Sequence, residues 1–143
     1  MAEYLYNPIQ EVAVGQNVLL QDSIPCTRGY VIHRNGSGIL TLRGIVNNPC
    51  AKFARYKVEY NGNIAVPTGE TVGEISLALA IDGEALQTSR ARVTPAAVEN
   101  YFNVTSVANV TVPAGCCLTI SVENTSTTPI NVQNSNLTVD RTA

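Results

Sequence analysis

Hydrophobic and polar residues alternate with a period of two along most of the chain. In the segment 54–60, Tyr56, Val58 and Tyr60 share one side, and charged residues occupy the positions between them. Further segments with the same alternation are 75–82, 103–112 and 118–122. A period of two is typical of strands that bury one face, as in half-solvated antiparallel sheets. The pattern therefore predicts an all-β protein.

Turn-forming residues separate these segments. The dipeptides Asn35-Gly36, Asn61-Gly62 and Asp82-Gly83 each stand between two β-type runs, which predicts a tight turn at each place. Counting such signals gives about eight to ten strands, with one strand about every 8 to 14 residues, as in a sandwich or jelly roll. We expect an antiparallel two-sheet jelly roll.

Two segments depart from the strand pattern. Thr94–Asn100 has an N-cap residue followed by proline, which allows a helical turn or two, but strands on both sides favour a short turn. Residues 1–8 precede the first turn signal, so we expect an extended arm there and a single domain over residues 9–143. We expect the arm to dock on a neighbouring subunit or on a larger particle through its apolar residues. These residues are Tyr4, Leu5 and Tyr6.

The amino-acid composition narrows the classes of function that the protein can have. Of the 143 residues, 45% are hydrophobic and only 14% are charged, so the surface must consist largely of Ser, Thr, Asn and Gly. Such a surface fits a subunit that packs against copies of itself. The net charge of −2 argues against nucleic-acid binding, which needs a basic stripe. No apolar run is long enough to span a membrane, and the N-terminus lacks a secretory signal, so we expect release by lysis or assembly into a particle.

The four cysteines carry the only special chemistry that the sequence suggests. Cys26 and Cys50 lie in predicted loops, whereas Cys116 and Cys117 are adjacent at the start of a strand. Disulfides, free buried thiols and a zinc site of four thiolates all remain open, although no CxxC spacing supports zinc. We expect no metal and no cofactor. The single histidine, His33, has no acidic neighbour in the sequence to activate a catalytic thiol, so we expect no enzyme.

Three segments together resemble the TNF/C1q-like jelly-roll superfamily, in particular its bacterial and phage branch and the C-terminal domains of spore-surface collagen-like glycoproteins. They are 55–64, 75–86 and 108–126, and the last strand, 136–141, is also similar. The resemblance covers residues 9–141. It implies a compact homotrimer whose inner sheets meet on a three-fold axis. The chain differs from the spore-surface proteins because it has no collagen-like Gly-X-Y region.

The resemblance gives the aromatic residues two alternative roles. On inward strand faces they can be ordinary core, or they can bury one subunit of a trimer against another. The candidates for the trimer interface are Tyr56, Tyr60, Tyr101 and Phe102.

Three classes of function follow. We expect a structural protein of a phage or prophage particle, such as a homotrimeric capsid decoration or fibre-tip module, made in the bacterial cytoplasm and located in the virion. The alternatives are a carbohydrate- or receptor-binding module and a spore or cell-surface coat protein. A cupin-like enzyme would need clustered histidines, and the chain has one.

Overall fold

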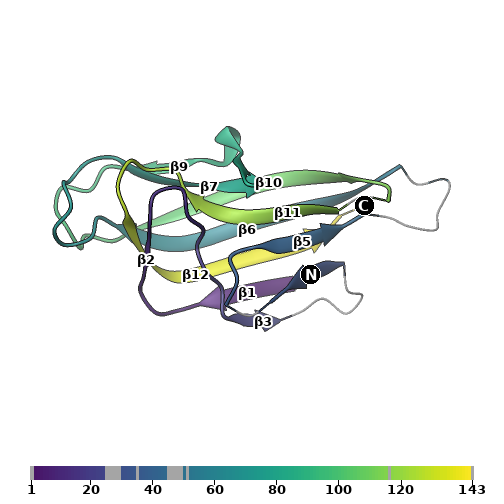
Figure 1. Ribbon diagram of the computed structural model, residues 1–143, viewed down its shortest axis with the longest axis horizontal. Coiled ribbons are helices and arrows are strands. Elements are labelled where there is room, and N and C mark those ends of the chain that lie inside the picture. The colour runs from purple at the N-terminus through teal and green to yellow at the C-terminus, as the bar shows by residue number, and fades with distance from the viewer. Residues whose placement is uncertain are drawn as a thin grey trace.

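The computed structural model describes residues 2–24, 30–34, 36–44, 50, 52–115 and 117–142. Regular structure in these residues consists of strands and one turn of 3-10 helix, η1 (Gln87–Ser89). Two antiparallel sheets pack face to face as a sandwich (Figure 1). The predicted all-β architecture is therefore confirmed.

The first sheet, called sheet A, has the order β10-β6-β12-β1-β3, and β2 also pairs with β12. Its strands are β1 (Ala2–Tyr6), β2 (Gln10–Val12), β3 (Asp22–Ile24), β6 (Phe53–Ala65), β10 (Phe102–Pro113) and β12 (Ile130–Arg141). The second sheet, called sheet B, has the order β4-β5-β11-β7-β8, and β9 also pairs with β7. Its strands are β4 (Val31–His33), β5 (Leu40–Arg43), β7 (Ile75–Ile81), β8 (Glu84–Ala85), β9 (Ala91–Val93) and β11 (Cys117–Asn124).

The hydrophobic core lies between the two sheets. The alternation of β6 places Tyr56, Val58 and Tyr60 on its inner face, and all three are fully buried. Leu77 and Ile120 of sheet B are buried in the same core cluster. Removal of this apolar surface from water stabilises the sandwich, because each fully buried branched or aromatic side chain contributes roughly 1.5–3 kcal/mol.

The arm predicted at residues 1–8 is a strand of sheet A. β1 pairs with β12 on one side and with β3 on the other, and Ala2 and Tyr4 are 1% exposed. The prediction of an extended docking arm was therefore wrong for Tyr4, and for Leu5 and Tyr6 the docking role stays a prediction. Tyr4 packs inward against His33 with ring centroids 4.7 Å apart, while Leu5 and Tyr6 are half-buried.

The tight turn predicted at Asn61-Gly62 was also wrong. β6 continues through both residues and pairs with β10 and β12 over this stretch. Gly62 is on the inner face, where its missing side chain makes room for the ring of Tyr60. Packing against two neighbouring strands thus overrides the local turn preference.

The segment 86–100 is less regular than a continuous strand. η1 lies between β8 and β9 and separates these two short strands. Thr94–Asn100 forms bends and a turn, as expected from its bracketing strands. No described residues form a helix of the length and apolarity that a membrane crossing takes.

Candidate interaction face

The outer face of sheet A carries a row of amide side chains that crosses four segments of the fold. Asn103 of β10 donates to Asn63 of β6 at 3.1 Å, and Asn63 donates to Asn134 of β12 at 3.1 Å. Asn134 in turn donates to Asn7, which follows β1. The row is possible because outward residues of neighbouring strands lie side by side, as Asn103 and Asn63 do in the strand register.

A second group of polar side chains runs beside this row. Thr105 donates to Asn61 Oδ1 at 3.3 Å, and Asn136 donates to Glu3 at 3.2 Å. Asn61 and Asn136 are themselves partners in the register of β6 and β12. This second group lines a shallow hollow of about 300 Å³ together with three neighbouring residues, Glu59, Tyr60 and Thr138.

We call these two rows the amide face. It consists of Asn7, Asn61, Asn63, Asn103, Thr105, Asn134 and Asn136. An amide both donates and accepts hydrogen bonds, so each of these Asn side chains can bond to a copy of itself. The amide nitrogen of Asn61 has no acceptor among the described residues and remains available at the surface.

A bulge in β12 shapes the amide face. The register of β12 against β6 shifts between Gln133 and Asn136, and Asn134 adopts φ 54°. Asparagine tolerates this left-handed conformation better than most residues. The extra residue turns Asn134 outward into the amide row and Ser135 inward, where its Oγ lies 3.0 Å from the hydroxyl of Tyr60. Burial raises the pKa of Tyr60 to about 12, and the bond to Ser135 offsets part of that rise.

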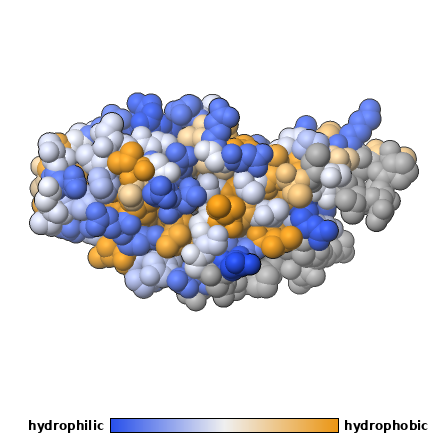
Figure 2. Space-filling view, in the orientation of Figure 1, coloured by the Kyte–Doolittle hydropathy of each residue, from blue (hydrophilic) through white to orange (hydrophobic). Residues whose placement is uncertain are grey.

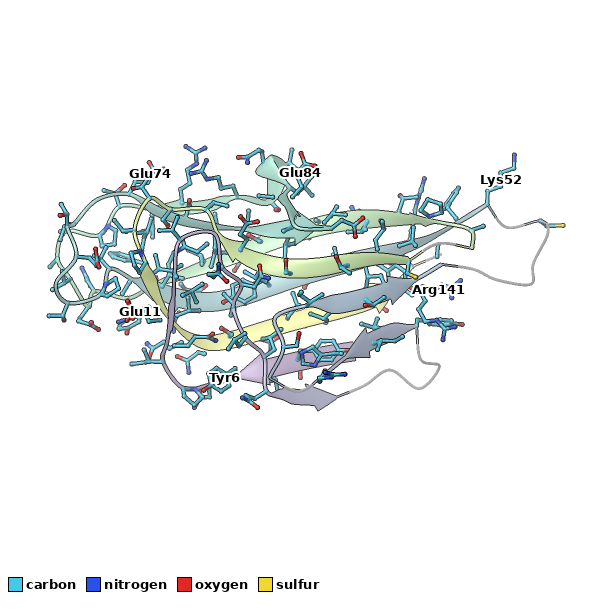
Figure 3. All side chains as sticks on the ribbon, in the orientation of Figure 1. Tyr6, Glu11, Lys52, Glu74, Glu84 and Arg141 are labelled. Atoms are coloured by element: carbon cyan, nitrogen blue, oxygen red, sulfur yellow. The ribbon has the colours of Figure 1, made fainter. Side chains whose placement is uncertain are left out.

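The rest of the outer face of sheet A is charged but mixed in sign. Lys57 and Glu59 form an ion pair at 3.0 Å, and Lys57 also lies opposite Asp140 in the register. An exposed pair of this kind contributes at most about 1 kcal/mol. Other charged side chains labelled in Figure 3, such as Lys52, Glu74 and Glu84, project from the margins of the sandwich. The amide face is therefore a largely neutral area within a sparsely charged surface.

Glu99 ties together the loops at one end of sheet A. Its carboxylate accepts hydrogen bonds from Thr68 and Asn131 and, on the other oxygen, from Tyr101 at 3.3 Å. Burial and the neighbouring Glu99 charge both raise the pKa of Tyr101. Phe102, the next residue, is 38% exposed. Tyr101 and Phe102 thus reach the surface beside the end of the amide row at Asn103.

The structure separates the four aromatic residues predicted for a trimer interface. Tyr56 and Tyr60 are fully buried inside the protomer, where Tyr56 donates to the carbonyl oxygen of Arg43 at 2.5 Å. The interface prediction was wrong for these two residues, because no partner can reach a side chain enclosed between the sheets. The alternative role in the core is correct for them. For Tyr101 and Phe102 the interface role stays a prediction.

Two of the four cysteines, Cys50 and Cys117, lie among the described residues. Cys117 is an exposed free thiol, and Cys50 is exposed. Cys26 and Cys116 lie outside the described residues, so the predicted disulfides stay a prediction. No group of three His, Cys, Asp or Glu side chains suited to a metal occurs among the residues described. His33 bonds through Nε2 to the carbonyl oxygen of Ser37 at 2.8 Å, and its ring packs on Tyr4.

Sequence reasoning missed the amide face. The signal was present, since Asn and Thr recur at alternate positions in 61–63, 103–105 and 134–136. The abundance of Asn, Ser and Thr in the chain hid it. Which of them share a face depends on the pairing of distant strands and on the bulge in β12, and neither is visible in local sequence.

Comparison with known proteins identifies the fold. No protein-family model and no curated protein sequence matches the chain. Among solved structures, it is similar to the globular domain of zebrafish complement 1qA protein, with TM-score 0.61 and 14% identity over 96% of this chain and 94% of that chain. It is also similar to Eiger TNF from S. frugiperda, with TM-score 0.69 and 13% identity over 100% of this chain and 92% of that chain. The predicted TNF/C1q-like jelly roll is confirmed.

Proposed function

On the premise that this chain has the C1q/TNF jelly-roll fold, we propose that it is a non-enzymatic structural subunit of a phage or prophage particle. In this proposal it forms a homotrimeric capsid decoration or fibre-tip module, and the subunits meet through the amide face. The observation that carries the proposal is the self-complementary chemistry of that face.

The geometry of the amide face favours contact between copies. Asn103, Asn63 and Asn134 are already held in place by hydrogen bonds within the protomer. Association therefore costs less side-chain entropy than it would for free side chains. The amide side chains themselves carry no charge, so they do not repel a copy of the same face. The carboxylates beside them are Glu3, which accepts a hydrogen bond from Asn136, and Glu59, which pairs with Lys57.

Aromatic and apolar residues at the margin support the same role. Phe102 is 38% exposed, and Val107 on the outward side of β10 is 46% exposed. Interfaces commonly combine such apolar anchors with a polar surround. Both residues lie in β10, the edge strand of sheet A, next to the amide rows.

The surroundings of the most reactive side chains favour a structural role over an enzymatic one. His33 bonds through Nε2 to the carbonyl oxygen of Ser37 and packs its ring on Tyr4, while Nδ1 is buried with no hydrogen-bond partner among the described residues. None of these contacts activates a nucleophile. The carboxylate of Glu99 accepts hydrogen bonds from Thr68 and Asn131, which hold the loops at this end of sheet A in place. The neutral surface, rich in Asn and Thr, supports the role in a particle. The alternative functions are a carbohydrate-binding module and a spore coat protein.

Light scattering after size exclusion tests the assembly. We expect a species of three times the 15.2 kDa of one chain. Asn61→Asp keeps the oxygen that accepts from Thr105 and adds a charge to the amide face, so it should dissociate the assembly. Gln87→Glu makes the same chemical change on the exposed η1 and should leave the mass unchanged. A wild-type monomer at micromolar concentration would refute the trimer.

Immunogold electron microscopy tests the particle role. Antibody to the purified protein should label phage-like particles released by lysis of the source bacterium. Labelling of spores or cell envelopes, with unlabelled particles, would instead favour the coat-protein alternative.

A further inference from the structure

The outer face of sheet B, on the opposite side of the sandwich from the amide face, exposes three large apolar side chains. Ile32 is 55% exposed, Ile39 is 49% exposed and Leu19 is 45% exposed. We call these three residues the apolar patch. In Figure 2, orange apolar atoms appear between blue and white ones over the middle of this face.

Strand pairing brings the members of the apolar patch together. Ile32 of β4 lies opposite Thr41 of β5, so Ile39, two residues before Thr41, projects on the same side of the sheet. The segment that contains Leu19 runs beside the start of β5, since Leu20 donates its backbone N–H to the carbonyl oxygen of Ser37 at 3.3 Å. The patch is therefore one surface built from three chain segments.

The fold holds the apolar patch in a fixed shape. The side-chain amide of Gln10 bonds to both backbone groups of Leu19, at 2.9 Å each. Val18 and Leu20, on either side of Leu19, are fully buried and force the side chain of Leu19 outward. A rigid apolar surface loses little entropy when a partner covers it.

Two arginines flank the apolar patch. Arg34 lies two residues after Ile32 and Arg43 two residues after Thr41, so both arginines point to the same outer face of sheet B. Both are exposed. Neither forms an ion pair with a residue that the structure describes. Two unpaired cations beside exposed isoleucines complement a partner that presents carboxylates around an apolar side chain.

We propose that this face docks a partner protein through an extended acidic segment, with a Leu, Ile or Phe on the apolar patch and Asp or Glu beside Arg34 and Arg43. The inference rests on the proposed function, in which the amide face is used between copies and the outer face of sheet B remains free for another particle component. Charge attraction sets the approach of the segment, and burial of the isoleucines supplies most of the affinity.

Fluorescence anisotropy with two designed peptides of about twelve residues tests the proposal. One peptide contains Glu and Leu, and the other replaces each Glu by Lys. The Glu-Leu peptide should bind the intact protein, more weakly at high salt, and the Lys-Leu peptide should not. The double variant Ile32→Ser with Ile39→Ser should raise the Kd of the Glu-Leu peptide at least about tenfold. Arg34→Gln with Arg43→Gln should raise the Kd and remove most of the salt dependence.

Val72→Ser is the matched control, because Val72 is an apolar residue of comparable exposure, 40%, in the loop before β7 and belongs to neither the amide face nor the apolar patch. It should leave peptide binding unchanged. Equal binding of both peptides, or unchanged binding in the isoleucine variant, would overturn the proposal. Loss of the trimer in the isoleucine variant would also overturn it, because the apolar patch would then be an interface between copies. Binding to phosphatidylserine vesicles that depends on the patch would overturn it too, because the patch would then be a membrane surface.

The same samples separate this inference from the proposed function. A monomer that still binds the Glu-Leu peptide refutes the trimer and supports the docking surface. A trimer that does not bind the peptide supports the proposed assembly and overturns the docking surface.

Discussion

The ring of Tyr60 lies over Gly62, two residues further along the same face of β6. A Cβ atom at position 62 would lie 2.5 Å from the hydroxyl oxygen of Tyr60. This close approach lets the hydroxyl reach Ser135 in the bulge of β12, at 3.0 Å. Gly62, which looks like a turn residue in the sequence, is thus the position against which a buried aromatic ring packs.

Gly62→Ala should destabilise the protein by about 1–3 kcal/mol, because the ring of Tyr60 must move within a packed core and its bond to Ser135 is strained or lost. Urea denaturation measures the change. Gly73→Ala, where an added Cβ meets nothing within 4 Å, is the control and should be nearly neutral. In a double mutant, Tyr60→Phe should recover part of the loss caused by Gly62→Ala; strictly additive effects would contradict the contact.

Stability should fall at alkaline pH because of Tyr60. Burial raises the pKa of Tyr60 from 10.0 to about 12, so the folded state resists its ionisation. Its contribution is fully present below pH 10 and is lost as the pH rises toward about 12, since the unfolded chain releases the proton first. The free energy of unfolding should decrease by about 2–3 kcal/mol over this window. Tyr60→Phe should flatten the curve, and a variant as pH-sensitive as the parent would exclude Tyr60 as the cause.

Tyr4→Ala should cost about 3–5 kcal/mol, as expected for loss of a fully buried aromatic side chain. Tyr6→Ala, at a half-buried position of the same strand, should cost much less. Thermal and urea unfolding of the two variants provide the comparison. If the two variants proved equally stable, β1 would be the loose arm that the sequence suggested.

Asn134 combines a left-handed backbone with two amide partners, and two substitutions separate these roles. Asn134→Gly keeps the φ of 54° without strain but loses the bonds to Asn63 and Asn7. Asn134→Val loses the bonds and also strains the bulge, so it should be less stable than the glycine variant by about 1–2 kcal/mol. Chemical denaturation distinguishes them. Equal stability of the glycine and valine variants would show that the bulge relaxes.

The fold was predictable because period-two alternation is a local signal. It identified β6, β7 and β10 through residues such as Val58, Leu77 and Val110. The errors arose where distant contacts decide the outcome. Asn61-Gly62 is a strong turn signal on its own, but the register of β6 with β10 and β12 keeps it extended.

The candidate sites were less predictable than the fold. Tyr56 and Tyr60 belong to the core because sheet B covers their side of β6. The alternation shows that the two residues share an apolar face, but it does not show whether sheet B or a second subunit covers that face. The amide face and the apolar patch each combine residues from at least three separate segments. Their composition could be seen in the sequence, but their assembly into surfaces depends on strand order.

The place of β12 in sheet A has a consequence for biosynthesis. β12 lies between β6 and β1, and Ala2 is the register partner of Val139. A nascent chain emerging from the ribosome therefore holds β1 and β6 without their common neighbour until residues 130–141 have appeared. Until β12 has emerged, β1 and β6 each offer an open edge that chaperones would need to shield.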